Sequence, residues 1–132
     1  MMNMQMMTDN PIGHDVAAEA AQVLNVLDDG GVAIIPLNVA YAILGRTEGA
    51  IRRIFEVKQR SFEKPSGMFG GAAASRDLHV LDDQGQAIRR ALIEDADLPF
   101  SIVANYRKDH PLLAGVDPFV LQTSTKGDTM DM

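Results

Sequence analysis

The amino-acid sequence predicts an α/β fold in which helices pack against a sheet. The first reason is composition: 46% of the 132 residues are hydrophobic and 23% are charged, as in chains that fold around a core. The second is the order of segments along the chain. A helical repeat of apolar residues precedes a pair of glycines, and a short run that is apolar throughout follows them. The length fits one domain, and a second independent core is not expected.

The amino-terminal part is expected to begin as a disordered tail over residues 1–13, because five of the eight Met fall in its first seven positions without a helical period. The folded domain then spans 14–132. Its first helix is predicted over 14–29, with Asp15 as the N-cap and a glycine pair after the last turn. The run Val32–Pro36 predicts a strand buried on both faces, because it has no polar position.

A second helix is predicted over residues 48–59, after an irregular segment or short strand at 37–45. Thr47 is suited to cap this helix. Its apolar stripe consists of Ile51, Ile54 and Phe55. Lys58 follows at helical spacing and is expected on the same side as the stripe. A glycine-rich loop comes next, with a short strand around 68–69.

The second half of the chain is predicted to contain a further helix and shorter elements. Asp83 and Gln86 have the spacing of a capping box, which predicts a helix through about Glu94. Its inward positions would be Ala87, Ile88, Ala91 and Leu92. The remaining elements are expected to be a strand at 99–104, a short helix at 110–115 and a last strand at 119–121.

Composition also excludes several classes of site. The chain has no Cys, which excludes disulfides, a thiol nucleophile and Cys-based zinc sites, and which fits a reducing compartment such as the cytoplasm. No metal site is expected, because the three histidines lack HExxH spacing. Surface or capping roles are predicted for His14, His79 and His110. No apolar run is long enough to cross a bilayer, so no membrane partner is expected.

Positive charge is concentrated in one segment of an otherwise acidic chain. The net charge is −6, but residues 46–64 hold six basic and three acidic residues and therefore carry +3. The remainder carries −9. A total charge of this sign argues against a generic nucleic-acid coat, whereas a local basic segment suits one anionic ligand. A solvated helix face is the simpler interpretation of the same charges.

The stretch from Gly30 to Pro65 resembles the amino-terminal part of the threonylcarbamoyl-AMP synthase family, the YrdC-like domains. The shared features, in order, are a glycine-preceded apolar strand ending in Pro36, a Tyr at position 41, a helix ending Lys58-Gln59-Arg60, and the pair Lys64-Pro65. The resemblance implies a YrdC-like twisted mixed sheet flanked by helices. In this chain the domain would be shortened, because the family continues into a Ser-x-Asn motif and further strands.

The resemblance implies a site and a reaction as well. Family members join L-threonine, bicarbonate and ATP into threonylcarbamoyl-adenylate, with Mg²⁺ accompanying the nucleotide, for tRNA modification. Lys58 and Arg60 would then be catalytic and nucleotide-binding, Lys64 would bind the nucleotide too, and Asn38 and Tyr41 would contact the substrate. Fixed cations suit this role, because they stabilise the charge that develops on phosphate oxygens.

The chain departs from the family where the amino acid would be recognised, since Leu37-Asn38-Val39 replaces a Thr-acid-Thr segment. This implies altered or lost amino-acid specificity and leaves open whether the chain is an enzyme. A shortened sheet would expose an edge, from which a homodimer is expected. The individual cations also allow structural roles: Lys58 favours the negative end of a helix dipole, and Arg60 can pair with Glu56.

Two other functions remain open at this point. One is a non-catalytic module that binds tRNA or double-stranded RNA through phosphate contacts. The other is an interaction fragment whose basic segment is only a helix surface.

Overall fold

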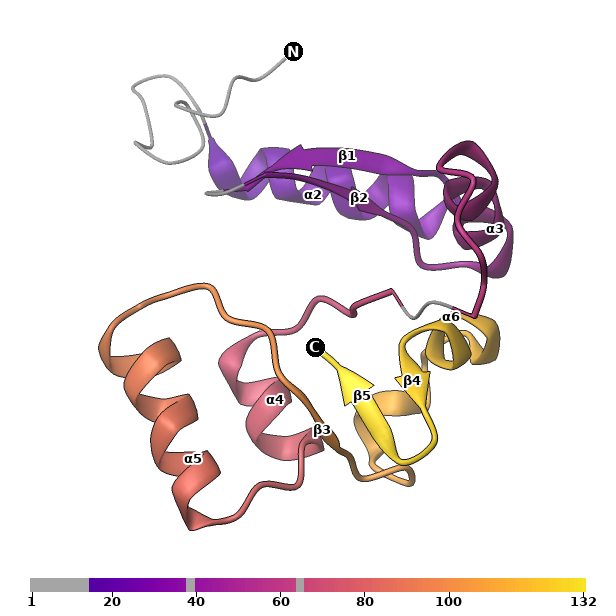
Figure 1. Ribbon diagram of the computed structural model, residues 1–132. Helices are drawn as coiled ribbons and strands as arrows, with labels where there is room; N and C mark the ends of the chain where they lie inside the picture. Colours follow the sequence, from indigo (N-terminus) through magenta and orange to yellow (C-terminus); the bar gives the residue numbers. More distant parts are fainter. Residues whose placement is uncertain (1–14, 38–39, 64–65) are drawn as a thin grey trace. The chain divides into compact units, whose positions relative to one another are not determined.

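The structure is a computed structural model that describes residues 15–37, 40–63 and 66–132 (Figure 1). The chain separates into two compact units, Met1–Arg60 (unit 1) and Ser61–Met132 (unit 2), where its length suggested one domain. Helices and strands are both present, as the α/β prediction requires. In the described residues the strands form two small antiparallel sheets, one in each unit, in place of the single sheet expected. The predicted tail over 1–13 lies outside the described residues.

Unit 1 begins with helix α2, Val16–Asp28, which confirms the first predicted helix. Its N-cap is Asp15, whose side chain accepts a hydrogen bond from the Ala18 amide at 3.1 Å. The helix ends before Gly30, whose φ of +80° favours glycine at this position. No residue of α2 is buried, so this helix contributes little to a core.

Strands β1 (Ala33–Pro36) and β2 (Tyr41–Leu44) form the hairpin of unit 1. Directly opposite residues share one face of the sheet, which places Ile34 beside Ile43. Ile34 is 65% exposed, so the prediction of a strand buried on both faces is wrong. The physical reason is that β1 has a single partner strand in a two-stranded sheet, and one face of that sheet stays open.

Helix α3, Glu48–Val57, supplies most of the buried residues of unit 1. Thr47 caps it as predicted, because its hydroxyl accepts a hydrogen bond from the Ala50 amide at 3.2 Å. The buried residues of the helix are Ala50, Ile51 and Phe55. Gly45 lies against this face, since an added Cβ there would come within 2.9 Å of the Ala50 Cβ.

Unit 2 contains helices α4, Ala72–Leu78, and α5, Asp83–Arg89, the latter continuing as a π-helical turn over Arg90–Asp95. The predicted helix at 83–94 is therefore present, with Asp82 as its N-cap. Its predicted inward face is wrong. Ile88 is exposed, whereas Arg89 is only 2% exposed and takes the inner position.

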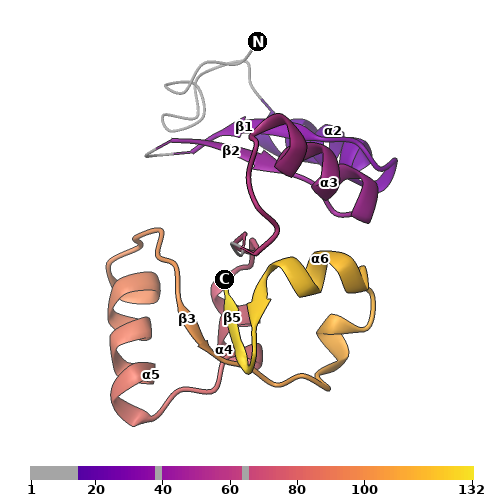
Figure 2. The same ribbon diagram turned by 45° about the vertical axis from the view of Figure 1, so that its right-hand side comes forward.

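The sheet of unit 2 has the strand order β3-β5-β4, with bounds Val103–Asn105, Thr129–Asp131 and Thr125–Lys126 respectively. Figure 1 shows α4 between α5 and the β4–β5 hairpin, and in the turned view of Figure 2 α4 is seen behind β5. The core of the unit is formed by Leu78, Leu113 and Met130. The expected strand around 68–69 is absent from this sheet, although the Met68 amide donates a hydrogen bond to the Asp131 carbonyl at 2.9 Å.

Two short helices complete unit 2. The 3₁₀ turn Pro111–Leu113 lies within the predicted short helix. Helix α6, Pro118–Thr123, occupies the segment predicted as a last strand, so that prediction is wrong. Asp117 explains the outcome, because its carboxylate caps the Phe119 and Val120 amides and Pro118 follows at the first helical position.

Candidate functional site

Three of the five predicted site residues fall within the described part of the chain. Lys58, Arg60 and Tyr41 all belong to unit 1, whereas Asn38 and Lys64 lie outside the described residues. Lys58 is the C-cap of α3, and Arg60 follows two positions later. The convergence of all three cations on one phosphate site remains a prediction.

The exit from α3 is a Schellman motif, which fixes the backbone between the two cations. Gln59 has a φ of +53°, and its amide donates a hydrogen bond to the Glu56 carbonyl at 3.0 Å. The Arg60 amide donates to the Phe55 carbonyl at 2.8 Å. These two bonds are the pair that defines the motif. Lys58 is the C-cap itself, and its amide bonds to the Ile54 carbonyl at 3.0 Å.

The Arg60 side chain folds back over the helix. Its guanidinium carbon lies 6.0 Å from the centroid of the Phe55 ring, at the limit of a cation–π contact. In Schellman motifs the residue at this position commonly packs on the one that Phe55 occupies here. Arg60 therefore has a structural role at the helix end that is independent of any ligand, and its half-buried side chain is held in a defined direction.

Lys58 has a different environment, because its side chain is exposed. It sits at the carboxyl end of α3, where the partial negative charge of the helix favours a cation. Other cations of the basic segment are neutralised within unit 1. Arg46 pairs with Asp28, and Arg52 pairs with Glu48 at 2.8 Å. Among the described residues, no carboxylate forms an ion pair with Lys58.

Tyr41 lies on the open face of the β1–β2 hairpin. It stands opposite Pro36 and is 55% exposed. Because side chains alternate along a strand, Tyr41 shares its face with Ile43, and the register adds Ile34. The hairpin thus presents an apolar face around the Tyr41 ring.

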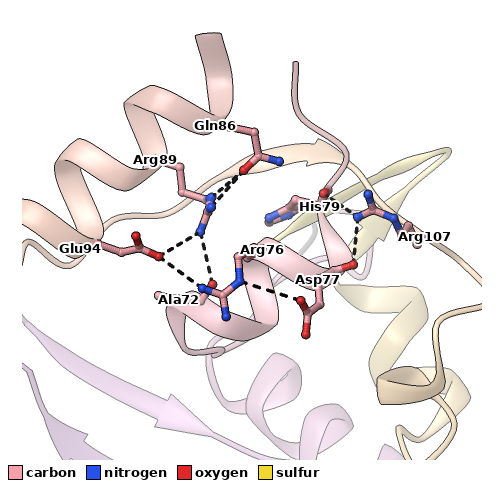
Figure 3. A network of polar contacts seen from close by, with 8 residues as sticks. All are labelled: Ala72, Arg76, Asp77, His79, Gln86, Arg89, Glu94 and Arg107. Carbon is pink, nitrogen blue, oxygen red and sulfur yellow. Dashed lines mark hydrogen bonds and ion pairs between the residues drawn. The ribbon is translucent and has the colours of Figure 1, made fainter. Parts of the chain in front are cut away.

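Sequence reasoning missed a polar network in unit 2 that is shown in Figure 3. At its centre is the buried Arg89, whose Nε and one terminal nitrogen donate to the Gln86 side-chain oxygen at 3.2 and 3.0 Å. Its other terminal nitrogen donates to the Ala72 carbonyl at 3.4 Å and lies 3.8 Å from Glu94. Arg76 approaches the same carboxylate at 3.5 Å, so Glu94 links α4 to the π-helical turn. The only local signal was the three-residue spacing of Gln86 and Arg89.

The second missed feature is a hydrogen-bonded pair of buried side chains, Ser75 and His79. The His79 ring is fully buried, so the predicted surface role is wrong, although His79 is the C-cap of α4. Its Nε2 lies 3.0 Å from the Met130 carbonyl oxygen, and its Nδ1 lies 3.0 Å from the Ser75 hydroxyl. The capping role predicted for His110 is confirmed, because its Nδ1 accepts a hydrogen bond from the Leu112 amide at 3.1 Å.

Two further findings concern the described part of the chain as a whole. It contains no group of three or more His, Asp or Glu side chains placed to hold a metal ion. Nor does any of its helices combine the length and apolar character needed to cross a membrane.

No protein-family model, curated protein or solved structure matches this chain.

Proposed function

We propose that the chain is a nucleotide-binding domain of the YrdC-like type that binds ATP with Mg²⁺ at the exit of α3. The observation that carries the proposal is the exposed Lys58, which has no carboxylate partner among the described residues and stands two positions from Arg60. The ordered motifs from Gly30 to Pro65 support the same assignment. The absence of cysteine suits a reducing compartment such as the cytoplasm.

The two cations would have separate tasks at a triphosphate. Arg60, held over Phe55, offers a planar group that can hold two phosphate oxygens in a fixed direction. Lys58, on a flexible stem, supplies a mobile point charge. Lys64 would add a third charge, and Asn38 and Tyr41 would contact an amino-acid substrate. If turnover occurs, it is transfer of the adenylyl group to a carbamate made from bicarbonate and L-threonine or another amino acid.

Calorimetric titration of the full chain with ATP and Mg²⁺ tests the proposal. K58A and R60A are each expected to weaken binding by about tenfold or more, the loss that follows from removing one charged hydrogen bond. K126A is the matched control, because Lys126 is an exposed cation in unit 2. R60K separates the charge of Arg60 from its planar shape.

A native chain that binds no ATP, or a K126A effect as large as that of K58A, would contradict the proposal. The same titration with tRNA in place of ATP tests the RNA-binding alternative. Binding of tRNA without ATP would favour that second function.

One observation favours a function in self-association, in line with the expected homodimer. A two-stranded hairpin is marginal by itself, and the apolar face with Ile34, Tyr41 and Ile43 is open in unit 1. A second copy of the chain would cover this face. Light scattering at micromolar concentration should then give a dimeric mass that I34E reduces to the monomeric one. I88E is the control, since Ile88 is an exposed isoleucine of unit 2. A monomeric mass for the native chain would exclude the dimer.

A further inference from the structure

Unit 2 contains a cavity of about 130 Å³ next to the buried Ser75. Its walls include the apolar side chains of Ile93, Leu98, Phe100 and Met132, and the backbone of two glycines contributes polar surface. Of the described residues that line it, Ser75 is the one that carries a side-chain hydroxyl. The cavity therefore combines a small volume, without charged side chains among its described lining residues, with one hydroxyl group.

The hydrogen bonds around His79 determine which way the Ser75 proton points. In the neutral form of the ring, the bond of 3.0 Å to the Met130 carbonyl places the proton on Nε2, because a carbonyl oxygen can only accept. Nδ1 then has a lone pair and no proton. In this tautomer the Ser75 hydroxyl, 3.0 Å away, donates to Nδ1. This is the arrangement in which an imidazole removes a proton from a serine nucleophile, with its other nitrogen held by a fixed acceptor.

In a purely structural role, the Ser75 hydroxyl would only provide a hydrogen-bond partner for Nδ1 of the buried His79. A serine in or at the end of a helix can donate its hydroxyl proton to the carbonyl four residues earlier, and Ser124, the C-cap of α6, does so by donating to Val120 at 3.1 Å. Ser75 uses the imidazole, and it borders a cavity that Ser124 does not line. Ser124 is buried to a similar degree, so it provides an internal comparison.

We propose that Ser75 is a nucleophile, activated by His79, in an acyl-transfer site for esters of short, uncharged acyl groups. We infer uncharged acyl groups because no charged side chain lines the cavity among the described residues. We infer short ones because its volume is well below the roughly 300–1,000 Å³ of drug-sized ligand sites. The site lies within unit 2 and does not depend on nucleotide binding at α3.

The reaction balances without a cofactor. The Ser75 Oγ forms a bond to the ester carbonyl carbon while its proton passes to Nδ1 of His79. The carbon–oxygen bond to the alcohol then breaks, and the departing oxygen takes that proton. Water attacks the acyl-serine by the same route and releases the carboxylic acid and the free hydroxyl. Throughout, the bond from Nε2 to the Met130 carbonyl keeps the ring oriented.

The first test treats the full chain with p-nitrophenyl acetate and locates acetyl groups by mass spectrometry after trypsin digestion. Acetylation is expected on the peptide that ends at Arg76, and S75A should abolish it. S124A should leave it unchanged. Release of p-nitrophenol should fall about 10²-fold in H79N, the contribution typical of general-base assistance, and at least as much in S75A, which removes the nucleophile. No acetyl group on Ser75, or equal acetylation of Ser124, would overturn the proposal.

A second test does not depend on removing the hydroxyl from a buried pair. The chain has no cysteine, so S75C and S124C each contain a single thiol. A thiol beside a histidine ionises more readily and reacts faster with iodoacetamide near neutral pH. The S75C thiol should react at least about tenfold faster than that of S124C, and adding H79N should remove the difference. Equal alkylation rates for S75C and S124C would refute activation by His79.

Discussion

At the exit of α3, Gln59 adopts a left-handed backbone conformation that glycine tolerates better than any other residue. A side chain there costs roughly 1–2 kcal/mol, yet the Schellman motif requires the conformation. The turn directs Arg60 back over Phe55, so the middle residue of the Lys-Gln-Arg sequence sets the direction of the last one.

Replacing Gln59 by glycine should therefore stabilise unit 1. The expected gain in the free energy of unfolding is about 1 kcal/mol, because the strain at a positive φ disappears. Urea denaturation measures it. Q22G is the matched control, since Gln22 is exposed within α2 and glycine there should destabilise by about 1 kcal/mol. The prediction fails if the two variants shift the midpoint in the same direction.

The role of a single residue could be predicted where its hydrogen-bond partner is close in the sequence. The caps Asp15 and Thr47 follow from neighbours three positions away. The burial of His79 does not, because its carbonyl partner on Met130 lies 51 positions further along the chain. Of the candidate site, the sequence alone identified Lys58 and Arg60, but it contained no local sign of the Ser75–His79 pair beyond a four-residue spacing.

At the scale of elements, α5 packs through a buried arginine where an apolar stripe was predicted. Arg89 holds the helix against α4 through the Ala72 carbonyl and shares Glu94 with Arg76 (Figure 3). A charged group can occupy a core position when its donors are paired in this way.

R89A should lower the free energy of unfolding by about 3 kcal/mol, because it leaves the Gln86 oxygen and the Ala72 carbonyl without their donor. R90A should cost no more than about 0.5 kcal/mol, since Arg90 approaches the same Glu94 from an exposed position at 4.0 Å. Thermal or urea unfolding distinguishes the two. A similar loss of unfolding free energy in R89A and R90A would show that the buried arginine contributes no more to stability than the exposed one.

The turn between β4 and β5 is tied to the segment after β3 by a pair of exposed charges. Lys108 donates a hydrogen bond to Asp128 at 2.5 Å. This bond, with the attraction between the charges, raises the pKa of Lys108 and lowers the pKa of Asp128. The stabilisation from the carboxylate is therefore complete above its unfolded pKa of about 3.9 and is lost as the pH falls through the lower folded value. The contribution of the lysine is complete below its unfolded pKa of about 10.4 and is lost as the pH rises through the raised folded value.

NMR titration of the Asp128 carboxyl group tests this pair. K108A should raise the pKa of Asp128 towards its ordinary value, because the donor and the positive charge are both removed. K126A should leave the pKa unchanged. An Asp128 pKa that does not respond to K108A would show that the two side chains are apart in solution.

The helices α2 and α3 were predictable because their caps and apolar spacing are local. In unit 2 the strand predicted at 99–104 overlaps β3, whereas β4 and β5 were not predicted, since they are short and have no apolar alternation. The segment Phe119–Leu121 has strand-forming residues, but the local cap from Asp117 and the proline after it decide for a helix.

For the whole molecule, the two units differ in how much they bury. In unit 1, helix α2 has no buried residue and Phe55 of α3 is the large side chain that is fully buried, whereas unit 2 encloses both Met130 and His79. The α/β character could be predicted from composition and segment order. The division into two sheets could not, because it depends on which distant segments pair, such as Val103 with Asp131.

Hydrogen exchange followed by mass spectrometry should show this difference. The amides of α2 are expected to exchange fastest among the helices, because fraying there exposes no core. The amides of β5 should exchange slowest, since the strand is central in its sheet and Met130 is buried. The buried segment of α3 should lie between them. Protection of α2 equal to that of β5 would contradict this order.

The order of strands in unit 2 has a consequence for synthesis on the ribosome. The central strand β5 comes later in the sequence than both of its neighbours, β3 and β4. A nascent chain that has not yet produced β5 holds β3 without a sheet partner and His79 without its acceptor. The β1–β2 hairpin, whose contacts are local, can form much earlier. During translation, unit 2 therefore passes through an intermediate in which β3 has no partner strand. Exposed strands in such an intermediate are prone to aggregate.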